Sequence, residues 1–250
     1  MLFWLQKRLK ISYWLRKILV SKSWQFILEK LFFVKRTSLR KIIFKLIFST
    51  NHWGRYQKIN PKNLQVSGVG SIPNTKQSQI LIEGLSNFCK KENIKSILDM
   101  PCGDFAWMKN FMKLNNNILY TGYDVVEDII EINNQYYSNS NIKFYTKDIV
   151  EIEDYGSFDL VFIRDFFIHI GNKEIIRVIN SLKKSKIKFF AFSSHNNTFF
   201  SDEKHDLNSD IALGQHRKLN MCINPFYMKD YYFSISEGVD GRFINFYKNF

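Results

Sequence analysis

The feature that most constrains this chain is a short apolar segment that ends in an acid and leads into a tight turn. Residues 96–99 read Ser-Ile-Leu-Asp, and Met-Pro-Cys-Gly-Asp follows directly. A second apolar segment, residues 118–123, is followed by Asp124. In an open α/β sheet such a turn brings backbone N–H groups close to a ligand, and an acid after the second strand accepts hydrogen bonds from ribose hydroxyls. The spacing therefore predicts a parallel-sheet domain that binds a nucleoside cofactor.

Apolar runs and amphipathic segments alternate from residue 76 to about residue 193. The segments with helical periodicity are 76–91, 104–114, 126–137 and 172–184. The runs typical of strands are 96–99, 118–123, 142–147, 158–163 and 188–193. Such alternation predicts a parallel sheet with helices on both faces.

The end of the chain has a different pattern. Residues 231–236 and 242–247 are strand-like runs, and the short connection between them contains Asp240-Gly241. An Asp-Gly pair between two strands favours a hairpin. We therefore expect an α/β fold with a doubly wound, mostly parallel seven-stranded sheet that finishes with an antiparallel edge strand.

Positive charge is concentrated at the start of the chain. Residues 1–50 hold 12 Lys and Arg and one acid, Glu29, whereas the remainder is nearly neutral. Large apolar side chains such as Trp24 and Leu31 fall between these cations at helical spacing. Breaking residues follow from Asn51 onwards. We expect a basic amphipathic helical extension over residues 1–50 and one domain over residues 51–250.

The role of the extension stays open at this point. It packs on its own domain or on a second subunit, with the cations as a solvated face, or it docks on a membrane surface or a protein partner. Nucleic acid is disfavoured because no known nucleic-acid motif is present. No apolar run reaches the roughly 18 residues of a spanning helix. Three scattered cysteines suit a reducing compartment, so we expect a cytoplasmic protein, with peripheral attachment to the inner face of a membrane as the alternative.

Several motifs within residues 50–250 resemble one family. The matching segments are residues 67–71 (SGVGS), 98–104 (LDMPCGD), Trp107-Met108, 159–165 (DLVFIRD) with His169, and residues 208–226. In this order they resemble the class I S-adenosylmethionine-dependent methyltransferases, and more narrowly a bacterial group linked to surface-polysaccharide and capsule biosynthesis. The commoner pattern of that class has three glycines after the first strand, whereas this chain has Pro101, Gly103 and Phe105.

The resemblance implies a cofactor, S-adenosylmethionine, and roles for the acids that follow the first three strands. Asp99 would order the turn and meet the amino group of the cofactor, and Asp124 would accept from both ribose hydroxyls. Asp148 would accept from the adenine amino group, with Ile149 against the ring. The alternative for each acid is a turn or helix cap. The full cofactor-binding set is Asp99, Pro101, Cys102, Gly103, Asp104, Asp124, Val125, Asp148, Ile149 and Arg164.

The catalytic candidates follow the fourth and fifth strands. Methyl transfer to oxygen needs alignment of the partners and a base for the hydroxyl proton. Asp165 and His169 would share a face of a helical turn, so that either is the base or Asp165 orients His169. His195 at the end of the fifth strand is a further candidate. The segment Ser67–Ser71 is either a flap over the cofactor or a surface loop.

The acceptor would be held by residues of the last third of the chain. The substrate-binding candidates are Arg164, His216, Arg217 and Asn220. Arg164 would bind an anionic group such as phosphate. Residues 205–210 carry ligand-type side chains, but no established metal spacing matches, so a polar loop is favoured over a metal site.

The patterns predict methyl transfer, and the resemblance implies as its acceptor a hydroxyl of a sugar, nucleotide-linked or phosphorylated intermediate of surface glycan synthesis. One alternative is N-methylation, or methylation of a lipid-linked acceptor at the membrane. Another is a scaffold protein that kept the fold without catalysis. A dinucleotide oxidoreductase is disfavoured, because Pro101 and Phe105 restrict the close approach that a pyrophosphate needs.

Overall fold

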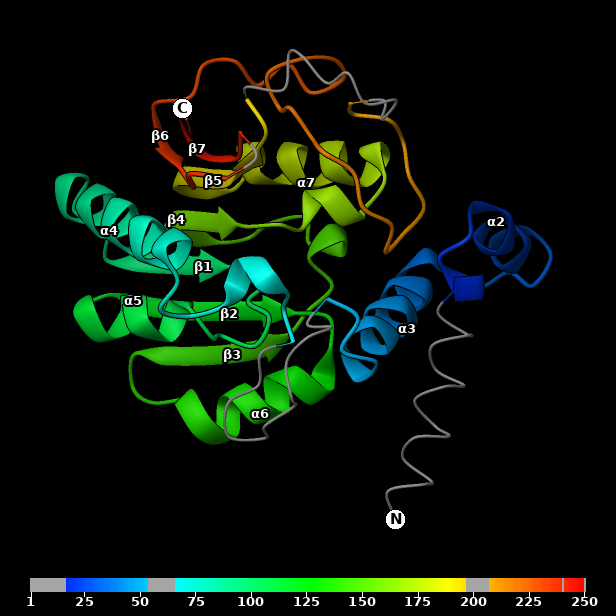
Figure 1. The fold of residues 1–250 in the computed structure, drawn as a ribbon, viewed down its shortest axis with the longest axis horizontal. Coiled ribbons are helices and arrows are strands. Elements are labelled where there is room, and N and C mark those ends of the chain that lie inside the picture. Colours follow the sequence, from blue (N-terminus) through cyan, green and yellow to red (C-terminus); the bar gives the residue numbers. More distant parts are fainter. Residues whose placement is uncertain (1–16, 54–65, 197–206, 240, 250) are drawn as a thin grey trace.

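A computed structural model describes residues 17–53, 66–196, 207–239 and 241–249 of the chain. A seven-stranded sheet lies at its centre, with strand order β3-β2-β1-β4-β5-β7-β6 (Figure 1). The strands are β1 (Ser96–Asp99), β2 (Leu119–Asp124), β3 (Ile142–Thr146), β4 (Ser157–Ile163), β5 (Lys186–Ser194), β6 (Phe233–Ser236) and β7 (Phe243–Lys248). The first five strands pair in parallel, and β7 is antiparallel to both of its neighbours, β5 and β6. The expected fold class is confirmed.

Helices surround this sheet and extend beyond one end of it. The helices are α2 (Lys22–Lys30), α3 (Arg36–Ser49), α4 (Lys76–Lys91), α5 (Met108–Leu114), α6 (Glu127–Tyr137) and α7 (Asn172–Lys184). Three short 3-10 turns are η1 (Val69–Ser71), η2 (Ile149–Glu151) and η3 (Phe167–His169). Among the described residues, no helix is both long enough and apolar enough to cross a membrane.

Alternation along the central strands separates two hydrophobic clusters. In β4 the side chains of Leu160 and Phe162 join a cluster with α4 and α5, whereas those of Val161 and Ile163 join a cluster with α3 and α7. Successive side chains of a strand point to opposite faces, so the two clusters lie on the two faces of the sheet. Burial on both faces explains why β4 reads as a continuous apolar run.

Two local expectations differ from the structure. The helix expected over 104–114 begins only at Met108, because Asp104 is held in the preceding turn by other partners. The expected hairpin is present, but its last strand, β7, lies between β5 and β6, so that β6 forms the edge. Burial explains this order, since Ile244 and Phe246 of β7 are fully buried.

Helix α3 of the basic N-terminal region packs against the domain. Its side chains Leu39, Ile43 and Ile47 are buried in the same cluster as α7. In Figure 1 this helix lies beyond the carboxyl ends of the central strands, and α2 lies farther out. The buried Arg40 pairs with three carboxylates, two at η2 (Asp148 and Glu151) and one on α7 (Glu174), so α3 is fixed by charge as well as by apolar contact.

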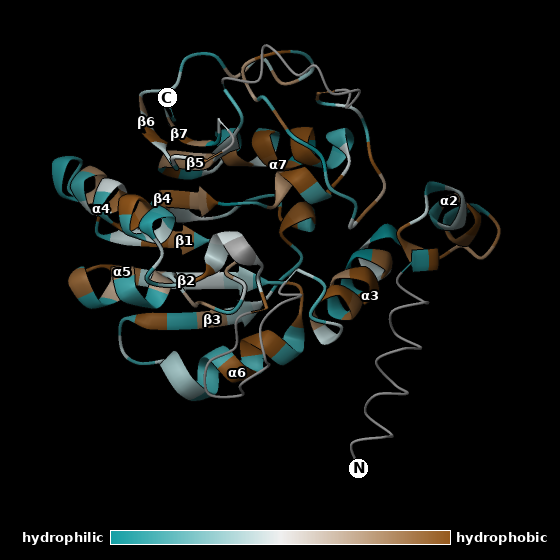
Figure 2. Cartoon of the chain, in the orientation of Figure 1, coloured by the Kyte–Doolittle hydropathy of each residue, from teal (hydrophilic) through white to brown (hydrophobic). Residues whose placement is uncertain are grey.

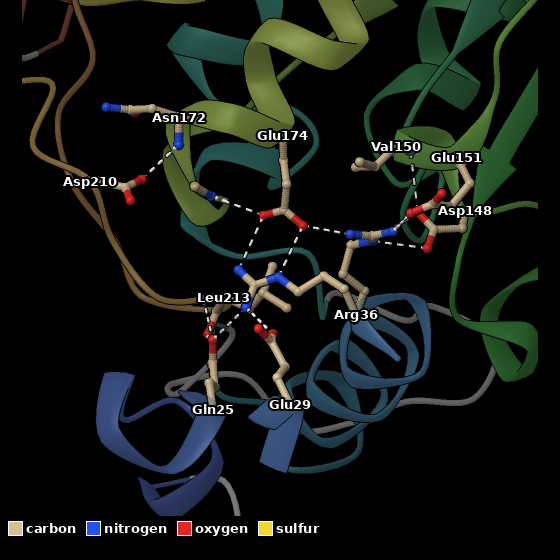
Figure 3. Close-up of polar contacts among 12 residues, drawn as sticks. Gln25, Glu29, Arg36, Asp148, Val150, Glu151, Asn172, Glu174, Asp210 and Leu213 are labelled. Atoms are coloured by element: carbon tan, nitrogen blue, oxygen red, sulfur yellow. Dashed lines mark hydrogen bonds and ion pairs between the residues drawn. The ribbon is translucent and has the colours of Figure 1, made fainter. Parts of the chain in front are cut away.

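Figure 3 shows the polar contacts that join this region to the domain. Arg36 bridges Glu29 of α2 and Glu174 of α7, with the closest N···O distance at 2.6 Å to Glu29. Gln25 exchanges hydrogen bonds with the backbone of Leu213 at 3.0 Å. These contacts connect α2, α3, α7 and the loop around residue 213 into one polar network.

Candidate active site

A cavity of about 570 Å³ lies at the carboxyl ends of the parallel strands. Its size is within the range of small-molecule sites, roughly 300–1,000 Å³. Carboxyl ends of parallel strands are where open α/β sheets bind their ligands. The predicted site residues that line it are Asp99, Pro101, Cys102, Gly103, Asp104, Asp124, Val125, Arg164, Asp165, His169 and His216. The structure thus brings together most of the residues that sequence reasoning selected.

One half of the cavity contains two buried acids at strand ends. Asp99 accepts a hydrogen bond from the Tyr120 hydroxyl at 2.7 Å. Asp124 accepts from the backbone N–H groups of Gly103 at 3.1 Å and Val126 at 2.9 Å. Burial raises the pKa of Asp99 to about 7 and that of Asp124 to about 6, although these hydrogen bonds oppose the shift. The protein by itself therefore compensates the charge of these carboxylates incompletely.

The turn after β1 is tied to the segment that begins at residue 66. Gly103 has φ +53°, and a Cβ there would lie 2.4 Å from Ser67 Oγ. Asp104 accepts from the N–H groups of Val66 at 2.7 Å and Ser67 at 3.0 Å. Ser67 Oγ in turn accepts from the Asp104 N–H at 3.0 Å. Only glycine fits this close contact, and Gly68 with its neighbours is placed along the cavity.

The other half of the cavity is built around His169. Its ring stacks on Trp53, with centroids 4.6 Å apart, and lies 5.7 Å from the ring of His216. Its Nδ1 is 2.9 Å from the Gln215 carbonyl oxygen. A carbonyl only accepts, so Nδ1 carries the hydrogen and Nε2 keeps the lone pair. Burial lowers the pKa of His169 to about 4, which keeps the ring neutral at pH 7.

Asp165 lies beside this histidine but is held by other groups. It has φ +54°, and η3 covers only Phe167–His169, so the expected shared helical face with His169 does not form. Both carboxylate oxygens lie 3.2 Å from Arg242, and Ser193 donates to one of them. Burial opposes ionisation, but the charges of Arg164 and Arg242 outweigh it and hold the pKa of Asp165 below its usual value.

Arg164 is neutralised by a glutamate that sequence reasoning missed. Its Nη2 donates to Glu237 at 2.7 Å and to the Gly70 carbonyl at 3.0 Å, and the guanidinium lies 5.6 Å above the Trp107 ring. Glu237 is only 1% exposed and sits at the β6–β7 connection. Its position in a predicted turn gave no sign of burial. Arg164 therefore holds the backbone at Gly70. Because Glu237 already neutralises its charge, Arg164 is a weaker candidate for binding an anionic acceptor.

Asp148 and Ile149 are not among the residues that line the cavity. The Nε–H of Arg40 is shared between the two carboxylate oxygens of Asp148, at 3.0 and 2.8 Å, and Asp148 also accepts from the Val150 N–H. Ile149 is buried in the hydrophobic cluster. The physical reason is the demand of the buried Arg40 for carboxylate partners, which the sequence could not reveal without knowledge of where α3 packs.

Three further candidates support the loop beside the cavity. The Arg217 guanidinium donates to the carbonyls of Phe167 and Ile170, and its backbone N–H donates to the Ile168 carbonyl at 3.2 Å. Asn220 is fully buried and accepts from the Cys222 N–H through its side chain. His195 is buried and its backbone donates to Leu219 at 2.7 Å. These contacts order the 208–222 loop, and none of the three residues lines the cavity.

The largest omission of sequence reasoning concerns aromatic residues from the N-terminal region. Phe44 and Phe48 of α3, followed by His52 and Trp53, line the cavity. The sequence assigned Phe44 and Phe48 only to an amphipathic extension, and it placed His52 and Trp53 among the breaking residues that follow it. His205 and Asp206 lie outside the described residues. Within the described ranges, no cluster of three or more His, Cys, Asp or Glu is arranged to hold a metal ion.

The comparisons with known proteins agree with this geometry. Residues 97–185 match a protein family described as "Methyltransferase domain". No curated protein sequence matches the chain significantly. Among solved structures, the methyltransferase domain of a bacterial Hen1 aligns with a TM-score of 0.51 and 14% identity, over 69% of this chain and 100% of that chain.

Two further solved structures show the same fold. The PH0226 protein of Pyrococcus horikoshii aligns with a TM-score of 0.50 and 16% identity, over 72% of this chain and 96% of that chain. An S-adenosylmethionine-dependent methyltransferase from Clostridium acetobutylicum gives a TM-score of 0.50 and 14% identity, over 68% and 91% of the two chains. At such identities the likeness is one of fold. The matched segment, the strand order and the cavity agree that the chain contains a methyltransferase domain built on a Rossmann-like sheet.

Proposed function

We propose that this protein transfers the methyl group of S-adenosylmethionine to a hydroxyl of a small acceptor, a sugar, nucleotide-linked or phosphorylated intermediate of surface glycan synthesis. The observation that carries the reaction type is one cavity with two undercompensated acids on one side and a neutral histidine on the other. The glycan acceptor rests on the resemblance of the motifs in residues 67–226.

The acid half of the cavity fits the cofactor. A sulfonium and an ammonium would supply positive charge and ribose hydroxyls would supply donors, in addition to the hydrogen bonds that Asp99 and Asp124 already accept. Carboxylates keep further lone pairs after accepting two backbone hydrogen bonds. We therefore assign Asp124 to the ribose and Asp99 to the positively charged end, with Gly103 permitting close backbone approach.

His169 is the base that we propose for the acceptor hydroxyl. S-adenosylmethionine supplies a methyl group that is already activated by its sulfonium, so the protein mainly aligns the partners and accepts one proton. The Gln215 carbonyl fixes the tautomer of His169 with the lone pair on Nε2. Trp53 holds the plane of the ring. At pH 7 the ring is neutral and its Nε2 lone pair is free, and the charge of Asp165 opposes the burial that disfavours the protonated ring.

Asp165 and Arg164 are positioning residues in this proposal. Asp165 stays ionised because Arg164 and Arg242 lower its pKa. Its negative charge then favours the protonated form of the nearby His169, while Asp165 itself does not take the proton. Arg164 holds the segment around Gly70 against the cavity. The exposed His216 at the same side of the site is the acceptor-binding candidate that the geometry retains.

We further propose that residues 51–250 form the methyltransferase domain in the cytoplasm, and that residues 1–50 are an extension that contributes to its site. The contribution is direct, because Phe44 and Phe48 of α3 line the cavity. The acceptor would then be enclosed by a wall that the central sheet alone does not supply.

The first test is calorimetric titration of S-adenosylmethionine and S-adenosylhomocysteine into the protein and into Asp124→Ala, with Asp128→Ala as control. Asp128 is an exposed acid four residues on that pairs with Lys45. Binding that is weakened only in Asp124→Ala supports the cofactor site. Methyl transfer from labelled cofactor is then measured on sugar, nucleotide-sugar and lipid-linked fractions. Label found only in the lipid fraction would show that the acceptor is lipid-linked and not the one proposed. If none of the three proteins bound the cofactor, the assignment of the cofactor site would be overturned.

A further inference from the structure

The connection between α2 and α3 presents three successive large apolar side chains to solvent. Leu31, Phe32 and Phe33 are 68%, 66% and 85% exposed, and Phe26 of α2 is 62% exposed. Figure 2 shows hydrophobic ribbon in α2 and its connection, at the end of the molecule farthest from α4 and α5. Contiguous exposed apolar surface of this kind marks an interaction site.

The backbone of this connection is ordered by hydrogen bonds to the end of α2. The N–H of Leu31 donates to Ile27 at 2.8 Å, and that of Val34 donates to Leu28 at 2.9 Å. Phe33 takes the left-handed conformation that ends the helix, with φ +52°. Glycine or asparagine is the usual residue in that conformation, so local backbone stability does not explain a phenylalanine there. The fixed backbone leaves the apolar side chains on the outside.

The charges around this apolar tip are positive. Lys30 and Lys35 flank it and are exposed, and among the described residues neither forms an ion pair with an acid. The one acid of residues 17–53, Glu29, is paired with Arg36 at 2.6 Å. Within residues 17–53 the tip therefore has a lysine on either side and no unpaired acid.

From these observations we infer that residues 26–35 dock on the surface of an anionic lipid bilayer. The apolar tip would enter the interface between headgroups and acyl chains, and Lys30 and Lys35 would lie among lipid phosphates. A bilayer is favoured over a protein groove because the apolar side chains stand on a loop between two helices and are flanked by two exposed lysines. The inference does not depend on the proposed methyl transfer, since it concerns a surface away from the cavity.

The test is co-sedimentation of the full chain with vesicles of phosphatidylcholine alone and of phosphatidylcholine mixed with phosphatidylglycerol. The matched variants are Leu31→Ser/Phe32→Ser/Phe33→Ser and, as control, Leu114→Ser/Tyr136→Ser/Tyr227→Ser. The control side chains are 73%, 49% and 62% exposed on other elements. We expect binding to the anionic vesicles, a loss of tenfold or more in the tip variant and little change in the control.

The charge contribution is tested by Lys30→Glu/Lys35→Glu against Lys143→Glu/Lys147→Glu, exposed lysines on and after β3. Only the first pair should weaken binding, and added salt should weaken binding of the unmodified protein. Calorimetric titration of S-adenosylmethionine into the tip variant checks that the fold and cofactor site persist, so a failed vesicle experiment is distinguished from a failed cofactor assignment.

Three results would overturn the inference. The unmodified chain does not sediment with anionic vesicles; the tip variant binds them as well as the unmodified chain does; or light scattering shows a dimer that the tip variant alone dissociates. The last result would assign the tip to a second copy of this chain.

Discussion

The two halves of the cavity are assembled in different ways. The acid half comes from consecutive strand ends, where Asp99 and Asp124 sit next to the turn at Gly103. The histidine half combines Trp53, His169 and the Gln215 carbonyl, which are far apart in the chain. The first half is therefore a local consequence of the sheet, whereas the second exists only when α3 and the 208–222 loop are docked.

The largest expected effect breaks the docking of α3. In Arg40→Met, the carboxylates of Asp148 and Glu174 lose a buried cation, which leaves uncompensated charge. We expect the free energy of unfolding to fall by about 3 kcal/mol or more. Urea unfolding checks this, with Lys41→Met as control, because Lys41 forms an exposed pair and should change stability by under about 0.5 kcal/mol. Equal effects of the two substitutions would show that α3 is not held by Arg40.

The next effect separates chemistry from cofactor binding. In His169→Ala, the base and the ring that stacks on Trp53 are both lost, and we expect kcat/KM to fall about 100-fold or more. The dissociation constant for S-adenosylmethionine should remain close to that of the unmodified protein, because the acids lie in the other half. Steady-state kinetics and calorimetry measure the two quantities. Retained turnover would remove His169 from the role of base.

A smaller effect is expected in the acid half. Asp124→Ala removes the proposed acceptor of the ribose hydroxyls and the partner of the Gly103 N–H. Cofactor affinity should fall about tenfold or more, as expected for the loss of a charge-assisted hydrogen bond. In the absence of cofactor, the folded variant should keep the contact of Trp53 with His169, which tryptophan fluorescence monitors. A change in fluorescence as large as that of Arg40→Met would show that the two halves are not separable.

A separate expected effect is the pH dependence of stability from Asp99. Its pKa in the folded protein is raised to about 7, chiefly by burial, so the folded state binds a proton that the unfolded state releases at lower pH. The stability from this group is full below its unfolded pKa and is lost as pH rises towards 7. Asp99→Asn should therefore lose less stability than the unmodified protein between pH 5 and pH 8. Urea unfolding at both values measures this, and parallel losses would contradict the assignment.

Elements with strong local periodicity were predicted well. Helices α4 and α7 have the expected bounds, and strand β1 covers the expected residues. The start of α5 was missed because Asp104 bonds to Val66 and Ser67, a contact between segments that local sequence does not encode. Long-range partners decide such details, and a sequence pattern describes only neighbours along the chain.

The same distinction holds for charged residues. Asp148 reads as a cofactor ligand from its place after β3, yet the structure pairs it with Arg40. Arg164 reads as an anion binder, yet Glu237 neutralises it. In both cases a buried charge takes the nearest opposite charge that folding brings to it, and the partner comes from an element distant in sequence.

By itself the sequence determined the parallel sheet and the acid half of the site, because the alternation of apolar residues and the turn at Gly103 act over a few neighbouring residues. Only the tertiary structure decided that α3 forms a wall of the cavity, that Trp53 stacks on His169 and that Gln215 sets its tautomer. These contacts depend on how the apolar faces of separate elements pack together. A local sequence pattern shows that a face is apolar, but it does not show which other element covers that face.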